Sequence, residues 1–140
     1  MKIVAALKPS LVYAAIVFAV GFLLGSVRVF FVVPRIGVRW AELLEAPLMI
    51  LASFLAARFI VFRWGLLGRV QCLIVGMLSL AFILLAEVSF VLARGLTISE
   101  YIASRDPVSG PVYLLSLGVF ATMPLLVRLG YESNILSKAN

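Results

Sequence analysis

Four long apolar segments constrain this chain more than any other feature. They cover approximately residues 10–33, 41–62, 70–92 and 111–129. A helix needs about 20 mostly apolar residues to cross the hydrocarbon core of a bilayer, and each segment approaches or exceeds that length. None of them alternates apolar and polar residues with a period of two, as the strands of a membrane barrel do. We therefore predict an all-α polytopic membrane protein, a four-transmembrane-helix bundle in which residues 1–140 form a single domain.

The composition supports a membrane protein and argues against several functional classes. Hydrophobic residues make up 64% of the chain and charged residues 13%, against roughly 45–50% and 25% in soluble domains. The formal net charge of +6 comes mainly from residues between the apolar segments, where they contact lipid headgroups, so we predict membrane lipids and no nucleic acid as partners. The chain has no histidine and one cysteine, Cys72. Because histidine is the commonest metal ligand and general base, we expect no metal, no cofactor and no enzymatic activity.

The connection over residues 93–110 is the longest, and it contains the capping-box pattern Thr97-Ile98-Ser99-Glu100. We predict a short amphipathic helix there, lying at the membrane interface. Proline cannot continue helical hydrogen bonding, so we expect the first span to end at Pro34 and Pro124 to kink the fourth. We expect the polar tail after Arg128 to be frayed.

The distribution of Lys and Arg predicts the orientation of the chain, because cytoplasmic loops carry an excess of both. The two termini and the second connection carry six of them: Lys2, Lys8, Arg63, Arg69, Arg128 and Lys138. The first and third connections carry four: Arg35, Arg39, Arg94 and Arg105. This bias predicts that both termini lie in the cytoplasm.

Ionisable residues at membrane depth are the candidate functional residues, because a charge at the centre of a membrane span costs roughly 2.5–3.5 kcal/mol on insertion scales. Their distances from the ends of the predicted spans, at 1.5 Å per residue, place four of them in one leaflet. These four are Arg28, Glu42, Glu45 and Glu87. Arg58 belongs to the opposite leaflet. Three carboxylates near one arginine leave an excess of negative charge, which a proton, water or another arginine must balance.

Two interpretations of this polar cluster remain. In the first, Arg28 pairs with Glu87 or Glu45 and fixes the first three helices relative to one another, with no transport or chemistry. In the second, the cluster lines a polar cavity that binds a proton, a cation or a cationic headgroup. On the first helix, Gly21 and Gly25 form a G-x-x-x-G step that predicts close helix packing, either within the bundle or between two copies of the chain.

Several stretches are similar to a group of small four-span bacterial inner-membrane proteins of unknown role. They are residues 25–28, Pro34-Arg35, residues 41–49 and residues 105–110, and the resemblance covers most of the chain. It implies a location in the bacterial inner (plasma) membrane and no particular activity. Small multidrug-resistance transporters and fluoride channels share the size and number of spans, but their motifs are not found here. In the former an essential Glu lies in the first span, which here holds only Arg28 as an ionisable residue.

Together these features predict a non-enzymatic accessory or scaffolding component of a membrane assembly. Its expected protein partner is a larger membrane complex or further copies of the same chain. The alternative is an oligomeric proton or small-cation transport protein that uses the Glu/Arg cluster.

Overall fold

The computed structural model describes residues 3–66 and 68–140, so Lys2, which counts toward the basic termini, lies outside the described residues. The described elements follow one another as α1 (Ile3–Val27), the π-helical turn η1 (Arg28–Val32), α2 (Val33–Ile36), α3 (Val38–Arg63), α4 (Arg69–Ala93), α5 (Ile98–Ser104) and α6 (Ser109–Ala139). Four helical stretches are long and apolar enough to cross a membrane: Ile3–Ile36, which combines α1, η1 and α2, and then α3, α4 and α6. The predicted four-helix bundle, with a short helix in the third connection, is confirmed.

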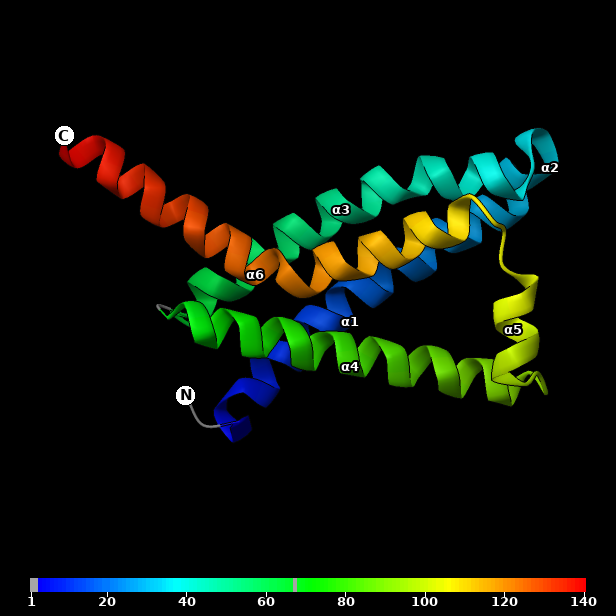
Figure 1. Ribbon diagram of the computed structural model, residues 1–140, viewed down its shortest axis with the longest axis horizontal. Helices are drawn as coiled ribbons and strands as arrows, with labels where there is room; N and C mark the ends of the chain where they lie inside the picture. Colours follow the sequence, from blue (N-terminus) through cyan, green and yellow to red (C-terminus); the bar gives the residue numbers. More distant parts are fainter. Residues whose placement is uncertain (1–2, 67) are drawn as a thin grey trace.

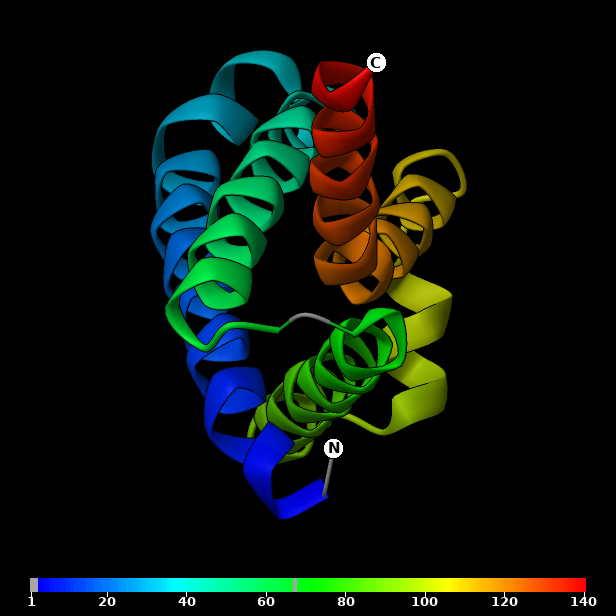
Figure 2. The same cartoon turned by 90° about the vertical axis from the view of Figure 1, so that its left-hand side faces the viewer.

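The four long helices form a ring in which α1 packs against α3 and α4, and α6 packs against the same two helices. Helices α3 and α4 therefore lie across the ring from each other although they are consecutive in the chain. Both termini and the α3–α4 connection lie at one end of the bundle, on the left in Figure 1, while the turn between α2 and α3 and the helix α5 lie at the other end. Figure 2 shows the ring from the end that holds the termini.

The first helix is longer than predicted at both ends. It begins at Ile3, with Pro9 inside it, and continues through Pro34 to Ile36. Pro34 does not end it, because η1 widens the preceding turn: the N–H of Val33 donates to the carbonyl of Arg28, five residues earlier. A wider turn gives room to the proline ring, which in a regular helix clashes with the carbonyl four residues before it. The helix ends instead at Gly37, whose φ of 87° suits glycine far better than other residues.

The expectation of a frayed tail after Arg128 is wrong, since α6 continues to Ala139. Glu132 stabilises the first turn of this extension. Its carboxylate lies 3.1 Å from Arg128 Nε, one turn earlier, and 2.9 Å from Arg69 Nη2 at the start of α4. Ion pairs of the i, i+4 type stabilise a helix, and the second pair ties this part of α6 to a neighbouring helix.

The predicted kink at Pro124 lies beside a contact between α1 and α6 at the centre of the bundle. Proline has no N–H, so the carbonyl of Phe120, four residues earlier, loses its helical donor. The hydroxyl of Tyr13 on α1 donates to that carbonyl at 2.7 Å, and the two rings stack with their centroids 4.5 Å apart. Tyr13 is fully buried. Figure 1 shows the bend in α6, which turns its C-terminal half away from the bundle.

A glycine outside the predicted G-x-x-x-G step allows a close approach of two helices. A Cβ atom at Gly76 of α4 would overlap the carbonyl oxygen of Ala121 on α6. The predicted packing residue Gly21 lies against Met49 of α3, where an added Cβ would meet the Met49 methyl at 3.3 Å. Gly25 has only the Arg28 side chain of its own helical stretch nearby. Gly21 therefore packs within the bundle, and of the glycines compared Gly76 has the least space, against α6.

We predict that Tyr13→Phe lowers the free energy of unfolding in mixed micelles by about 1–2 kcal/mol, because the Phe120 carbonyl loses its donor in an apolar interior. The exposed Tyr131 provides the control, and Tyr131→Phe should change little. In a Pro124→Ala background the helix regains the missing N–H, so the effect of Tyr13→Phe should shrink. An equal loss in both backgrounds would contradict this role of Tyr13.

Candidate functional site

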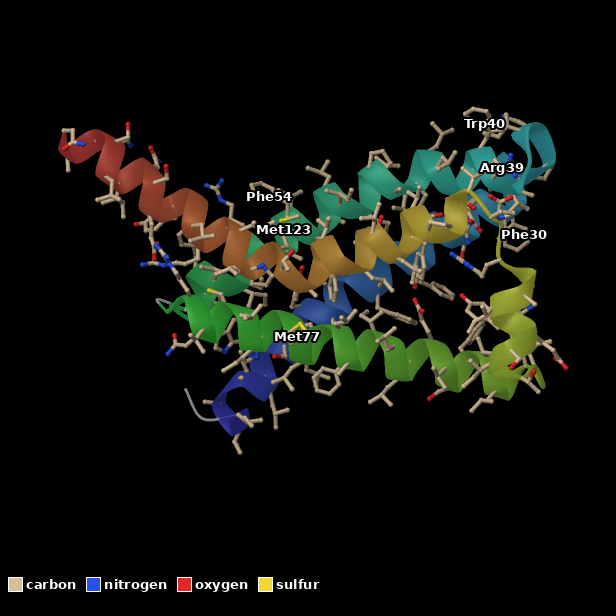
Figure 3. The ribbon with its side chains drawn as sticks, in the orientation of Figure 1. Phe30, Arg39, Trp40, Phe54, Met77 and Met123 are labelled. Carbon is tan, nitrogen blue, oxygen red and sulfur yellow. The ribbon has the colours of Figure 1, made fainter. Side chains whose placement is uncertain are left out.

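Polar side chains gather at the end of the bundle that holds the α2–α3 turn and α5. Arg39, labelled in Figure 3, lies at this end close to the start of α3. The π-helical turn η1 and the first turns of α3 both reach the same region, which brings Arg28 close to Glu42 and Glu45.

Arg28 forms the centre of the cluster. Its Nη1 lies 3.0 Å from Glu45 Oε2 and 3.9 Å from Glu42 Oε1. The three side chains are mostly buried, with exposed fractions of 28% for Arg28, 15% for Glu42 and 16% for Glu45. The contact with Glu45 is an ion pair without hydrogen-bond geometry, so the buried Oε2 atom of Glu45 accepts no hydrogen bond from the described residues. Arg28 thus lies within ion-pair distance of two carboxylates.

Helix α6 contributes the second contact of the cluster. The hydroxyl of Ser109, at the first residue of α6, donates to Glu42 Oε2 at 2.5 Å. Ser109 is 2% exposed and the Glu42 side chain 15%, so this hydrogen bond to an acidic side chain is partly buried. Together, Arg28 and Ser109 join η1, α3 and α6 through the acidic residues of α3.

Asp106 holds the start of α6 in place beside this cluster. Its Oδ2 accepts hydrogen bonds from the backbone N–H groups of Val108 and Ser109 at 2.9 and 2.8 Å, as an N-cap side chain does. Pro107 follows it, at a position where a missing N–H costs nothing. Arg39 Nε also donates to both carboxylate oxygens, at 3.2 and 3.1 Å. The hydrogen bond from the Ser109 N–H, helped by those from Arg39 and Val108, lowers the pKa of Asp106 from 3.8 to about 2.

Glu87 does not join the Arg28 cluster. It lies on α4, across the ring from α3, and its Oε1 accepts a hydrogen bond from the hydroxyl of Tyr113 on α6. The guanidinium of Arg105 lies over the Tyr113 ring, 4.6 Å from its centroid. The four predicted residues therefore form two groups, one around Arg28 and one around Glu87, with Arg105 close to the second.

Arg58, predicted for the opposite leaflet, lies in the half of α3 that leads to the α3–α4 connection. It is exposed, and its guanidinium lies 5.8 Å from the centroid of the Phe62 ring. The structure thus separates Arg58 from Arg28, Glu42 and Glu45, as its position in the sequence predicts.

Four residues of the site were not among the candidates: Arg39, Asp106, Ser109 and Tyr113. The sequence Asp106-Pro107-Val108-Ser109 is a typical helix start, with an N-cap residue followed by proline, and it could have identified Asp106. Nothing in the sequence links Ser109 to Glu42, which lies 67 positions earlier. Within residues 3–66 and 68–140, no three His, Cys, Asp or Glu side chains are grouped in a way that could hold a metal ion.

Comparison with family models, with curated proteins and with solved structures found no match to this chain.

We predict that Asp106 stabilises the fold only above its lowered pKa. A group whose pKa falls on folding stabilises the folded state above its ordinary value, here 3.8, and loses that contribution as the pH falls through about 2. The wild type should therefore be more stable than Asp106→Asn at pH 5, and this difference should shrink on acidification toward pH 2. Unfolding of both proteins in micelles across this range measures the difference. A constant difference would contradict the role assigned to Asp106.

Proposed function

We propose that this protein is a non-enzymatic accessory or scaffolding component of an assembly in the bacterial inner membrane, with both termini in the cytoplasm. One observation carries the proposal: the charged side chains at membrane depth in the Arg28 cluster are engaged by groups of the same chain. Arg28 pairs with Glu45 and Glu42, and Ser109 donates to Glu42. Such a cluster fixes helices relative to one another, which a scaffold requires.

The packing at the centre of the bundle also supports a structural role. Tyr13 reaches across the ring from α1 and stacks on Phe120 of α6. Beside it, Gly76 of α4 lies directly against the backbone of α6 at Ala121. Buried apolar residues surround these contacts, among them Ile60 and Val75, both with no exposed surface. The buried hydroxyl groups in this region are engaged within the chain: Ser10 donates to the Ala6 carbonyl and Ser79 donates to the Ser10 carbonyl.

The outer face of the first helical stretch is the surface that we propose for protein partners. It exposes large apolar side chains near the end of the bundle that holds the polar cluster: Phe22 (64%), Leu23 (66%), Phe30 (73%) and Phe31 (61%). In lipid such a face is stable alone, and it can also pack against the helices of another membrane protein.

We expect the chain to migrate with a larger complex after mild solubilisation, and we expect Phe30→Ala combined with Phe31→Ala to release it. Leu114→Ala combined with Leu115→Ala is the matched control, because these two α6 residues are equally exposed at 66% and 70% but lie on another helix. Size-exclusion chromatography with quantification of the co-purified chains measures the effect. A protein that is solitary at every detergent concentration would contradict the proposal.

A second candidate function is oligomeric transport of protons or small cations through the Glu/Arg cluster. One observation favours it: Glu42 and Glu45 share the single positive charge of Arg28, which leaves negative charge that a proton or a cation could balance. We predict for this alternative that proteoliposomes show a proton or potassium flux, and that Glu45→Gln and Glu87→Gln each reduce it. A flux that neither substitution changes, or no flux at all, would remove this candidate.

A further inference from the structure

A shallow groove runs along the outer face of the bundle between α1 and α3, across the middle of both helices. Its floor contains half-buried or buried residues, such as Ala52 and Ala56, and its walls contain more exposed ones, such as Leu51 and Leu55. All the lining residues are apolar: Ile16, Val20, Leu24, Leu48, Leu51, Ala52, Leu55, Ala56 and Phe59. Because the alanine side chains at positions 52 and 56 are small, a depression remains between the larger side chains on either side of them.

A basic hollow continues the groove toward the end of α3. Leu55 and Phe59 line both, and Arg58, Phe62 and Arg63 complete the hollow. No carboxylate among the described residues lies within ion-pair distance of Arg58 or Arg63. Their contacts are with aromatic rings, Arg58 with Phe62 at 5.8 Å and Arg63 with Trp64 at 5.5 Å. Two arginines beside an apolar groove thus have no anionic partner in the part of the chain that the structure describes.

The length of the groove is about half the thickness of the hydrocarbon core of a bilayer. Leu48 and Phe59 are eleven residues apart on α3, which corresponds to about 16 Å along the helix axis. The hydrocarbon core of a bilayer is about 30 Å thick, so one leaflet measures about 15 Å. Arg63 is the last residue of α3, so the basic hollow lies at the headgroup end of the groove. Leu48 is fifteen residues from Arg63, about 22 Å along the axis, so the groove and the hollow together extend past the middle of the hydrocarbon core. Arg58 lies five residues deeper and can extend its guanidinium toward the same level.

From these observations we propose that the groove binds an anionic phospholipid. One acyl chain lies along the apolar groove, and the phosphate of the headgroup contacts Arg58 and Arg63. A guanidinium is well suited to this role, because its N–H groups match the oxygens of a phosphate and its charge is always present. Basic hollows beside membrane helices are a general means of selecting anionic headgroups over zwitterionic ones.

Two other occupants suit the groove less well. A second copy related by two-fold symmetry would contribute the same surface, so the arginines of both copies would approach each other. Soluble phosphate would satisfy Arg58 and Arg63 but would leave the apolar groove unfilled. Only a molecule with an anionic head and an apolar chain satisfies both parts.

Native mass spectrometry of the full chain, in micelles supplied with phosphatidylglycerol or phosphatidylcholine, tests the proposal. We expect one phosphatidylglycerol to remain bound to the wild type under conditions that remove phosphatidylcholine. Arg58→Gln combined with Arg63→Gln should weaken its retention about tenfold or more, since both contacts to the phosphate are lost. Ala52→Phe keeps both arginines but fills the floor of the groove, and it should weaken retention of phosphatidylglycerol as well.

Arg94→Gln is the matched control, because Arg94 is also exposed and contacts a phenylalanine ring, Phe90, at 5.7 Å, but lies at the other end of the bundle. It should leave retention unchanged. Equal retention of the two lipids, or equal losses in the Arg94 and Arg58/Arg63 variants, would overturn the proposal. So would an Ala52→Phe variant that changes the number of chains per particle but not lipid retention, because that result would assign the groove to a second copy.

Discussion

In a hydrocarbon environment no water is available for a backbone carbonyl that lacks a donor, so each proline within a spanning helix must be compensated by the protein itself. This constraint explains much of the bundle. Pro124 leaves the Phe120 carbonyl without its helical donor. The Tyr13 hydroxyl donates to this carbonyl instead, and the contact fixes α1 against α6 through the centre of the ring. Near Pro34 the helix widens by a π-helical turn that begins at Arg28, the residue that contacts the acidic side chains of α3.

The sequence predicted those parts of the fold that depend on local or one-dimensional information. The lengths of the apolar segments predicted four helices, and the capping box at Thr97 predicted α5, where the Thr97 hydroxyl accepts the N–H of Glu100 at 3.1 Å. The sequence did not predict the features of the fold that depend on a contact with a residue far away in the chain. Glu132 contacts Arg69, 63 positions earlier, and ties the extended part of α6 to α4. The close contact at Gly76 likewise depends on which helix lies next to α4.

The same distinction applies to the site. Depth along each span placed Arg28 near Glu42 and Glu45, and the structure brings these three together. The depth of a residue along its span does not reveal which helices are neighbours in the bundle. In the ring, α6 rather than α4 lies beside α3. Ser109 of α6 therefore contacts Glu42, while Glu87 of α4 contacts Tyr113 instead. The N-cap role of Asp106 was accessible from the sequence, because Asp followed by Pro is a local pattern.

The scaffold role proposed for this bundle requires the ion pair between Arg28 and Glu45 to be a structural contact within one chain. A double-mutant cycle with Arg28→Gln and Glu45→Gln, measured as unfolding free energy in mixed micelles, tests it most directly. Residues in direct contact show interaction energies of about 0.5–3 kcal/mol, so Arg28→Gln should cost clearly less once Glu45 has already been replaced. If the two losses simply add, to within about 0.5 kcal/mol, the two side chains do not stabilise each other and the account is wrong.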